Sequence, residues 1–298
     1  MQRVEGPTPT FLILGAPKCG TTSLAYWLMD HPDVHVPPEK ELYFFDAEFE
    51  RGLDWYRSRL DGAGARAVGE ATPAYLAAAE APARIASAVP QARLIALLRD
   101  PVDRAYSHYQ HWAQEKQERR TFAEVVELEL SRPPIDEARA WDPERPERYS
   151  YLAFGRYHRQ LLRYLDHFSR EQMLVLLLED LHEDPVSAWQ QVCRHIDVDP
   201  DIVPRTVGET FFSYRSYRPW WLWSMIQRIR LGERLPRKLG GLMWRAMVKE
   251  GNSYEPLSAE LRTRLADAHA PDNVELAAFL GRDLGHWGHI APAPLAAR

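Results

Sequence analysis

The segment Gly15-Ala-Pro-Lys-Cys-Gly-Thr-Thr-Ser23 is the most informative stretch about the fold, because it joins a short apolar run to a helical pattern. The apolar run at 11–14 predicts a buried strand, and 23–29 predicts a helix that opens on three hydroxyl-bearing residues. Glycines in such a turn allow close backbone approach, and the start of the helix offers unpaired N–H groups and a positive dipole end. With Lys18 these features predict a phosphate or sulfate site rather than a plain strand-to-helix turn.

The position of the lysine in this loop differs from that in a nucleotide triphosphatase. Such loops read G-x-x-x-x-G-K-[ST]. Counted from Gly15, the second glycine falls correctly at Gly20, but the lysine position is occupied by Thr21 and the lysine lies inside the loop at Lys18. The displacement argues against ATP with magnesium and favours another phosphate-bearing donor. A phosphate-loop kinase that uses ATP remains the alternative enzyme.

Further strands and helices alternate along the chain. Apolar runs at 93–98 and 172–178 predict two more buried strands, and helical patterns follow them. Alternation of this kind is typical of a parallel sheet with helices on both faces. The predicted fold class is therefore α/β, a three-layer sandwich around a central parallel sheet. The predicted helices span 102–117, 185–196 and 259–280.

Composition limits the class of protein. The chain has 298 residues, 45% of them hydrophobic, which suits one large domain over 1–298. A formal net charge of −5 gives no reason to expect a nucleic-acid partner. Two distant cysteines and no apparent secretory signal favour the cytoplasm. The predominance of arginine among the basic residues, with abundant alanine, hints at a bacterial source.

A second polar group follows the strand at 93–98. Arg99 stands at its carboxyl end, where ligands bind in open α/β sheets, and Ser107 lies eight residues further along. An arginine fork and a hydroxyl are a sound pair for holding a phosphate monoester. The structural alternative is an ion pair, either Arg99 with Asp103 or Asp100 with Arg104.

A third segment, 40–46, is a charged pair that runs into an aromatic stretch, which we interpret as a strand. Deprotonating an acceptor hydroxyl needs a carboxylate or an imidazole, and burial beside aromatic rings makes a glutamate a better base. Glu41 is the candidate, although a glutamate taken alone is usually a surface residue. His35, His108 and His111 are the rival bases.

These three segments resemble motifs of the sulfotransferases that use 3′-phosphoadenosine 5′-phosphosulfate (PAPS). The nearest branch is that of heparan-sulfate and bacterial carbohydrate sulfotransferases. The resemblance implies the P-loop NTPase-like sulfotransferase fold, PAPS as co-substrate, adenosine 3′,5′-bisphosphate as product, and no metal. It implies that Glu41 is the catalytic base and that Lys18 supports the bridging oxygen of the donor. The residues it assigns to the nucleotide are Lys18, Cys19, Gly20, Thr21, Thr22, Ser23, Arg99, Ser107 and, from a more variable region, Arg218.

The likeness continues through 54–56, 69–75, 155–157, 179–180 and 284–287, with one departure. The glycan-acting animal enzymes generally carry a lysine where this chain has Ala71, which puts a polyanionic glycan acceptor in doubt and leaves Lys18, with Lys40, to support charge. The expected acceptor is a sugar hydroxyl or a small-molecule natural product. A non-catalytic nucleotide-binding protein is the alternative outside enzymes.

The segment at about 213–250 combines tryptophan with many basic residues. One interpretation is a helical insertion or lid over the acceptor, with Arg218 reaching the 3′-phosphate. Another is a helix that meets a membrane, which we do not favour. The third is an ordinary buried helix pair with a basic outer face.

Overall fold

The computed structural model describes residues 7–60, 62, 64–114, 118–131, 150–211, 215–217, 248–250 and 256–287. The chain divides into two compact units, one made of 1–211 with 257–292 and the other of 212–256 with 293–298. In the second unit, strands β6 (Arg215–Tyr217) and β7 (Val248–Glu250) pair antiparallel. The rest of the proposed lid, Arg218 included, lies outside the described residues, as does the proline-rich and charged stretch at 132–148.

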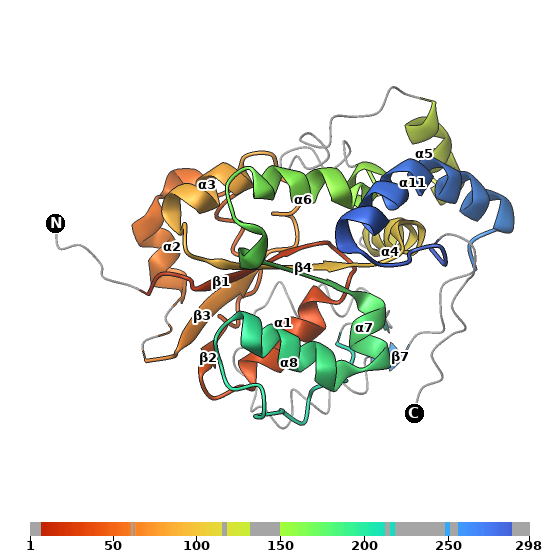
Figure 1. Ribbon diagram of the computed structural model, residues 1–298. Coiled ribbons are helices and arrows are strands. Elements are labelled where there is room, and N and C mark those ends of the chain that lie inside the picture. Colours follow the sequence, from red (N-terminus) through yellow and green to blue (C-terminus); the bar gives the residue numbers. More distant parts are fainter. Residues whose placement is uncertain are drawn as a thin grey trace. The chain divides into compact units, whose positions relative to one another are not determined.

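A five-stranded parallel sheet forms the centre of the first unit (Figure 1). Its strand order is β2-β3-β1-β4-β5, and each neighbouring pair runs parallel. The strands are β1 (Phe11–Gly15), β2 (Val34–His35), β3 (Ala67–Ala71), β4 (Arg93–Leu98) and β5 (Met173–Leu177).

Helices cover both faces of this sheet, which confirms the predicted three-layer α/β fold (Figure 1). One face carries α1 (Thr21–Met29), α7 (Leu178–Glu183) and α8 (Pro185–His195). The other face carries α3 (Ala81–Ala88), α4 (Pro101–Gln114), α6 (Tyr157–Leu165) and α11 (Ala259–Leu280). The remaining elements are α2 (Leu53–Leu60), α5 (Phe122–Leu130) and the 3-10 turns η1 (Phe49–Arg51), η4 (Ala153–Gly155) and η5 (Arg170–Gln172).

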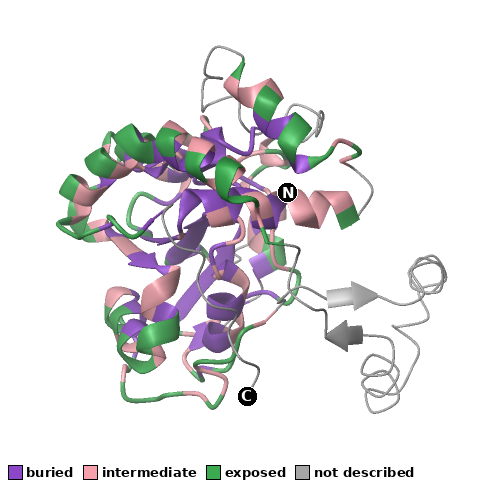
Figure 2. Ribbon diagram, turned by 90° about the vertical axis from the view of Figure 1, so that its right-hand side faces the viewer, coloured by how far each residue is buried: buried purple, intermediate pink, exposed green. Residues whose placement is uncertain are grey.

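Burial on both faces explains why the three strands predicted from apolar runs, at 11–14, 93–98 and 172–178, are found within one residue of their expected bounds. All residues of β1 and β3 are buried, and β4 is buried from its second residue onward. Figure 2 shows buried residues concentrated in the strands and on the inner sides of the helices. Continuous apolar runs are the sequence pattern of such strands, because neither face meets water. The helix expected at 23–29 begins two residues earlier, at Thr21.

The order of the strands places two loops at a topological switch point. After β1 the chain forms β2 and then β3 on one side of β1, whereas β4 lies on the other side. The helix that follows β1 lies on one face of the sheet and the helix that follows β4 on the opposite face. Open α/β sheets bind ligands outside the carboxyl ends of the strands at such a point. The loops that begin at Gly15 and Arg99 therefore share the expected binding edge.

A buried histidine beneath η4 makes stability depend on pH. His269 of α11 is 1% exposed, and neither ring nitrogen has a hydrogen-bond partner among the described residues. Burial, with the charges of Arg104 and Arg156, lowers its pKa from 6.5 to about 3. The unfolded chain then binds the extra proton between these values, so this stability is present above about pH 6.5 and is lost as the pH falls.

We expect the free energy of unfolding to fall by ~2 kcal/mol through this one group between about pH 7.5 and about pH 5. Urea denaturation at the two pH values measures it. His269→Leu should reduce the pH-dependent difference by that amount, whatever its effect at neutral pH. Replacement of the exposed His167 by Gln is the matched control and should leave the difference unchanged. An undiminished difference in His269→Leu would contradict the assignment.

Candidate active site

The loop after β1 turns sharply beneath the end of β4. The Ala16 amide donates to the Leu97 carbonyl (2.7 Å), which ties the start of the loop to β4. Gly20 has a left-handed φ of 90°, and a Cβ there would lie 2.8 Å from the Leu178 side chain. Glycine suits this position for both reasons. Lys18 also has a left-handed backbone, with φ of 70°.

Helix α1 begins at this loop without a side-chain cap. Its N-cap residue is Gly20, so the first turn has no side-chain hydrogen bond of the usual capping kind. The hydroxyl of Ser23 accepts the Phe211 amide (3.0 Å), and the hydroxyl of Thr22 accepts from Lys40. Backbone N–H groups of an uncapped first turn are a favourable site for an anion. Thr21 and Ser23 are buried, whereas Thr22 is half-buried.

Lys40 joins the loop to the segment of the candidate base. Its Nζ donates to the Thr22 hydroxyl (2.8 Å) and lies 5.6 Å from the centre of the Tyr26 ring. Burial lowers the pKa of Lys40, and the adjacent Glu41 acts in the opposite direction. A second lysine therefore stands at the anion loop, and its neighbour in sequence is the candidate base.

The segment 41–46 is not a strand, and the interpretation as an aromatic strand was wrong. It is irregular up to Tyr43 and then turns. Glu41 and Tyr43 have left-handed φ values of 66° and 51°, which a strand does not allow. The Glu41 amide donates to the carbonyl of Ala71 at the end of β3 (3.1 Å), and the Tyr43 hydroxyl donates to the Glu41 carboxylate. Glu41 thus lies at the same carboxyl edge of the sheet as the anion loop.

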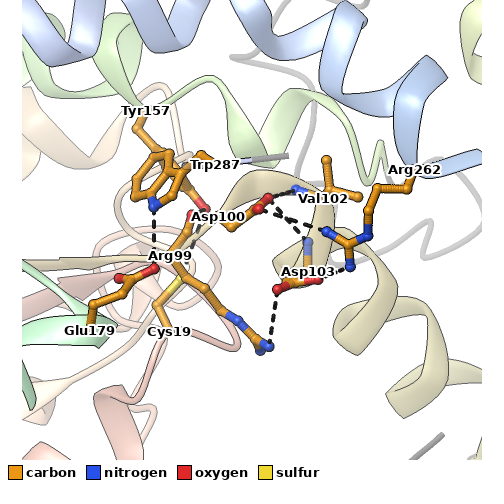
Figure 3. A network of polar contacts seen from close by, with 9 residues as sticks. All are labelled: Cys19, Arg99, Asp100, Val102, Asp103, Tyr157, Glu179, Arg262 and Trp287. Atoms are coloured by element: carbon orange, nitrogen blue, oxygen red, sulfur yellow. Dashed lines mark hydrogen bonds and ion pairs between the residues drawn. The ribbon is translucent and has the colours of Figure 1, made fainter. Parts of the chain in front are cut away.

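Tyr157 connects the anion loop to Arg99 (Figure 3). Its hydroxyl donates to the Arg99 carbonyl (2.9 Å) and contacts the Cys19 sulfur at 3.9 Å. Burial raises the pKa of the Cys19 thiol to about 11, so this side chain is a neutral packing group at neutral pH. Ser107 is 9% exposed on α4, the helix that follows Arg99.

The ion pair considered as the structural alternative for Arg99 is present but long. Arg99 Nη2 lies 3.9 Å from Asp103 Oδ2, while Arg262 makes a much closer contact with the same carboxylate (Figure 3). The Asp100 carboxylate accepts the Val102 amide at 2.7 Å. Because Asp103 has this second cation, it does not depend on Arg99 for charge compensation. The Arg99 side chain remains 27% exposed at the binding edge.

The three rival histidines occupy different environments. His35 ends β2, an edge strand separated from β1 by β3. His108 is buried with N–H groups of Arg104 and Trp112 facing its ring nitrogens, and burial and the Arg104 charge hold its pKa well below the ordinary value. His111 is half-buried, and burial followed by the charge of Lys18 lowers its pKa to about 4. The Lys18 charge contributes to the lowering of the pKa of both His108 and His111, and His111 is the less buried of these two imidazoles.

The later segments of the resemblance meet beside Arg99. Glu179 follows β5, and its Oε1 accepts from the Trp287 indole (3.2 Å). Burial raises the pKa of Glu179, and Arg99 is among the charges that oppose the rise. Next to it, Asp180 forms a double contact with Arg282 (2.6 and 2.7 Å). These contacts bring residues more than 100 positions apart to one edge of the sheet. Figure 3 shows the pair of Glu179 and Trp287.

Two residues near the site, Glu70 and Tyr157, were not predicted from the sequence. Glu70 lies within the motif at 69–75 and is 1% exposed, yet nothing in its local pattern distinguishes it from a surface carboxylate. The small residues around it suit a buried strand, but that pattern does not mark the carboxylate itself as buried. The assigned nucleotide and catalytic roles of the loop residues, Arg99, Ser107 and Glu41 stay predictions.

Comparisons with known proteins agree on one family. A family model described as a sulfotransferase domain matches residues 8–232. A solved sulfotransferase from Alicyclobacillus acidocaldarius is 31% identical, with a TM-score of 0.68 over 94% of this chain and 99% of that one. Human bifunctional heparan sulfate N-deacetylase/N-sulfotransferase 3 is 30% identical over 293 residues, or 94% of this chain and 31% of the relative. Human heparan sulfate glucosamine 3-O-sulfotransferase 3A1 is 28% identical over 284 residues, covering 94% and 63%. The chain thus spans less than two thirds of either human relative.

Proposed function

The chain belongs to the sulfotransferase family, and from that membership we propose that it transfers the sulfuryl group of PAPS to an acceptor hydroxyl. The observation that carries the proposal is the meeting of the anion loop and Arg99 at the topological switch point of the sheet. The loop presents an uncapped helix start with Lys18, and Arg99 stands at the end of the neighbouring strand. The two would hold the phosphates at opposite ends of an adenosine bisphosphate.

Each group has a role that follows from its chemistry. The loop amides and Lys18 would stabilise negative charge on the departing 5′-phosphate, since donors fixed in advance act most strongly where charge develops. Arg99 and Ser107 would bind the 3′-phosphate and so fix the nucleotide. Glu41 would accept the proton of the acceptor hydroxyl as its oxygen attacks sulfur and the phosphate leaves. Lys40 adds positive charge at Thr22.

The proposed acceptor class comes from the relatives rather than from the geometry of the site. The human relative glucosamine 3-O-sulfotransferase 3A1 is named for transfer to an oxygen of a sugar, so a sugar hydroxyl is the first class that we propose. Ala71 stands where glycan-acting animal enzymes generally have a lysine, so we keep a small-molecule natural product as the second. Cytoplasmic location is likewise a proposal. Within the part of the chain that the structure describes, no helix is long and apolar enough to cross a membrane.

Isothermal titration with adenosine 3′,5′-bisphosphate, without magnesium, tests the donor. We expect the bisphosphate to bind and ATP with magnesium to bind at least about tenfold more weakly, because the lysine does not occupy the triphosphatase position. Arg99→Ala should weaken the binding of the bisphosphate at least about tenfold, since an arginine–phosphate contact is charge-assisted. Arg93→Ala removes an exposed arginine from the opposite end of β4. This control variant should bind the bisphosphate as tightly as the wild type does.

Preference for ATP with magnesium would overturn the proposal and make the kinase the better hypothesis. Equal loss of binding in Arg99→Ala and Arg93→Ala would remove the role given to the Arg99 guanidinium.

A further inference from the structure

A buried carboxylate lies directly behind the segment that carries the candidate base. Glu70 in β3 is 1% exposed and accepts four hydrogen bonds. Its Oε1 accepts from the hydroxyls of Tyr56 (3.1 Å) and Tyr75 (2.8 Å). Its Oε2 accepts from the Thr72 hydroxyl (2.7 Å) and the Leu42 amide (3.4 Å). Burial raises the pKa of Glu70 while the donors act against the rise, and four donors match an acceptor-only carboxylate.

The same groups hold the backbone on both sides of Glu41. Besides Leu42, the Tyr43 amide donates to the Thr72 hydroxyl (3.4 Å) and the Phe45 amide to the Tyr75 hydroxyl (3.3 Å). Three side chains of one seven-residue segment, 69–75, therefore accept hydrogen bonds from three amides of 42–45. The hydroxyls of Thr72 and Tyr75 each donate to Glu70 and accept from an amide, so the contacts form one connected network.

This network explains an unusual backbone. Glu41 and Tyr43 both have left-handed φ values, and neither is a glycine. Non-glycine residues with such angles are strained and persist only where the surroundings fix them. The bonds to Leu42 and Tyr43 supply that constraint, because any regular strand or helix would turn these amides elsewhere.

We propose that Glu70, Thr72 and Tyr75, which we call the positioning cluster, fix the backbone of 41–45 and thereby aim the Glu41 carboxylate at the acceptor. The inference rests on the proposed function in one respect, the role of Glu41 as base. The geometry of the network does not depend on that role. The members of the cluster are positioning residues, since they act through the backbone rather than on substrate.

Thr72→Val is the sharpest variant, because it keeps the shape of the side chain and removes both hydrogen bonds of the hydroxyl. We expect amide hydrogen exchange of the peptide containing 42–45 to accelerate at least about tenfold, as bonds that restrain local opening are lost. Exchange in β4 should stay unchanged. Thr72→Ser restores the hydroxyl and should restore slow exchange. This measurement needs no substrate.

Turnover separates positioning from general stability. With PAPS and desulfated heparin as the probe acceptor, Thr72→Val should lower kcat about tenfold or more, toward the ~10²-fold cost of a 1 Å misplacement. The Kd for adenosine 3′,5′-bisphosphate should stay within about twofold of wild type, because the donor loop is not part of the network. In a Glu41→Gln background, Thr72→Val should lower kcat no further, since residues acting through one group are not additive.

Tyr56→Phe is the matched control. Tyr56 also donates to Glu70 but does not accept an amide of 42–45, and its ring stacks on Phe44 at 4.4 Å with or without the hydroxyl. Tyr56→Phe should leave exchange and kcat within about twofold of wild type, whereas Tyr75→Phe should accelerate exchange at Phe45.

Unchanged exchange in Thr72→Val overturns the inference, and so do multiplying effects of Thr72→Val and Glu41→Gln on kcat. Failure of the proposed function looks different. Glu41→Gln alone would then turn over PAPS normally, or the wild type would not bind the bisphosphate. Faster exchange in Thr72→Val without any measurable wild-type transfer would support the cluster and count against the proposed acceptor.

Discussion

Replacing Glu41 with glutamine is expected to lower kcat at least about 10²-fold and to leave the binding of adenosine 3′,5′-bisphosphate unchanged. The amide has the shape of the carboxylate but cannot take the acceptor proton at neutral pH. The Glu41 backbone is held at the binding edge by the Ala71 carbonyl rather than by the anion loop. Loss of the Glu41 carboxylate should therefore not disturb the binding of the donor nucleotide. Single-turnover measurement of PAPS consumption isolates the chemical step from product release.

His111 supplies the control for this prediction. Burial and the Lys18 charge lower its pKa to about 4. The imidazole is therefore neutral at physiological pH and has a lone pair that is able to accept a proton. If Glu41 is the base, His111→Gln should reduce turnover less than Glu41→Gln does. Near-normal turnover in Glu41→Gln with a large loss in His111→Gln would transfer the role of base to the histidine.

Lys18→Ala is expected to weaken the binding of the bisphosphate. It is also expected to lower kcat by about 10²–10³-fold, which is the cost of removing one fixed donor that stabilises developing charge. Lys18 lies inside the loop with a left-handed backbone, next to the uncapped start of α1. Its charge should matter more as the 5′-phosphate departs than in the ground state. The loss in kcat should therefore exceed the loss in binding, as comparison of kcat with the bisphosphate Kd will show.

Two further variants check that this effect is specific. Arg66→Ala removes an exposed cation that pairs with Asp197, and it should leave both quantities unchanged. Lys18→Arg keeps the charge in a different shape and should recover binding more than turnover, because a guanidinium does not replace a compact ammonium at a fixed point. A Lys18→Ala enzyme with an unchanged rate would refute the assigned role.

The layered fold and the position of the anion loop could be predicted from the sequence alone. Buried parallel strands appear as continuous apolar runs, and the glycines and hydroxyls between 15 and 23 indicate an anion-binding turn at the start of a helix. The helix at 259–280 was predicted with its observed bounds, although Pro271 lies within it. These signals are local, since they depend on neighbours within a few residues.

The way in which the base is held depends instead on tertiary contacts. The segment 41–46 has a strand-like composition, but its amides are bonded to side chains of β3 and of the turn that follows β3, about 30 residues away in sequence, and its backbone adopts left-handed angles. Likewise, the contacts of Tyr157 with Arg99 and of Glu179 with Trp287 join residues far apart in the chain. Long-range hydrogen bonds leave no periodic trace in a sequence, because each partner satisfies the local pattern of its own segment. A buried Glu70 and a solvated glutamate look the same until the fold brings the four donors together.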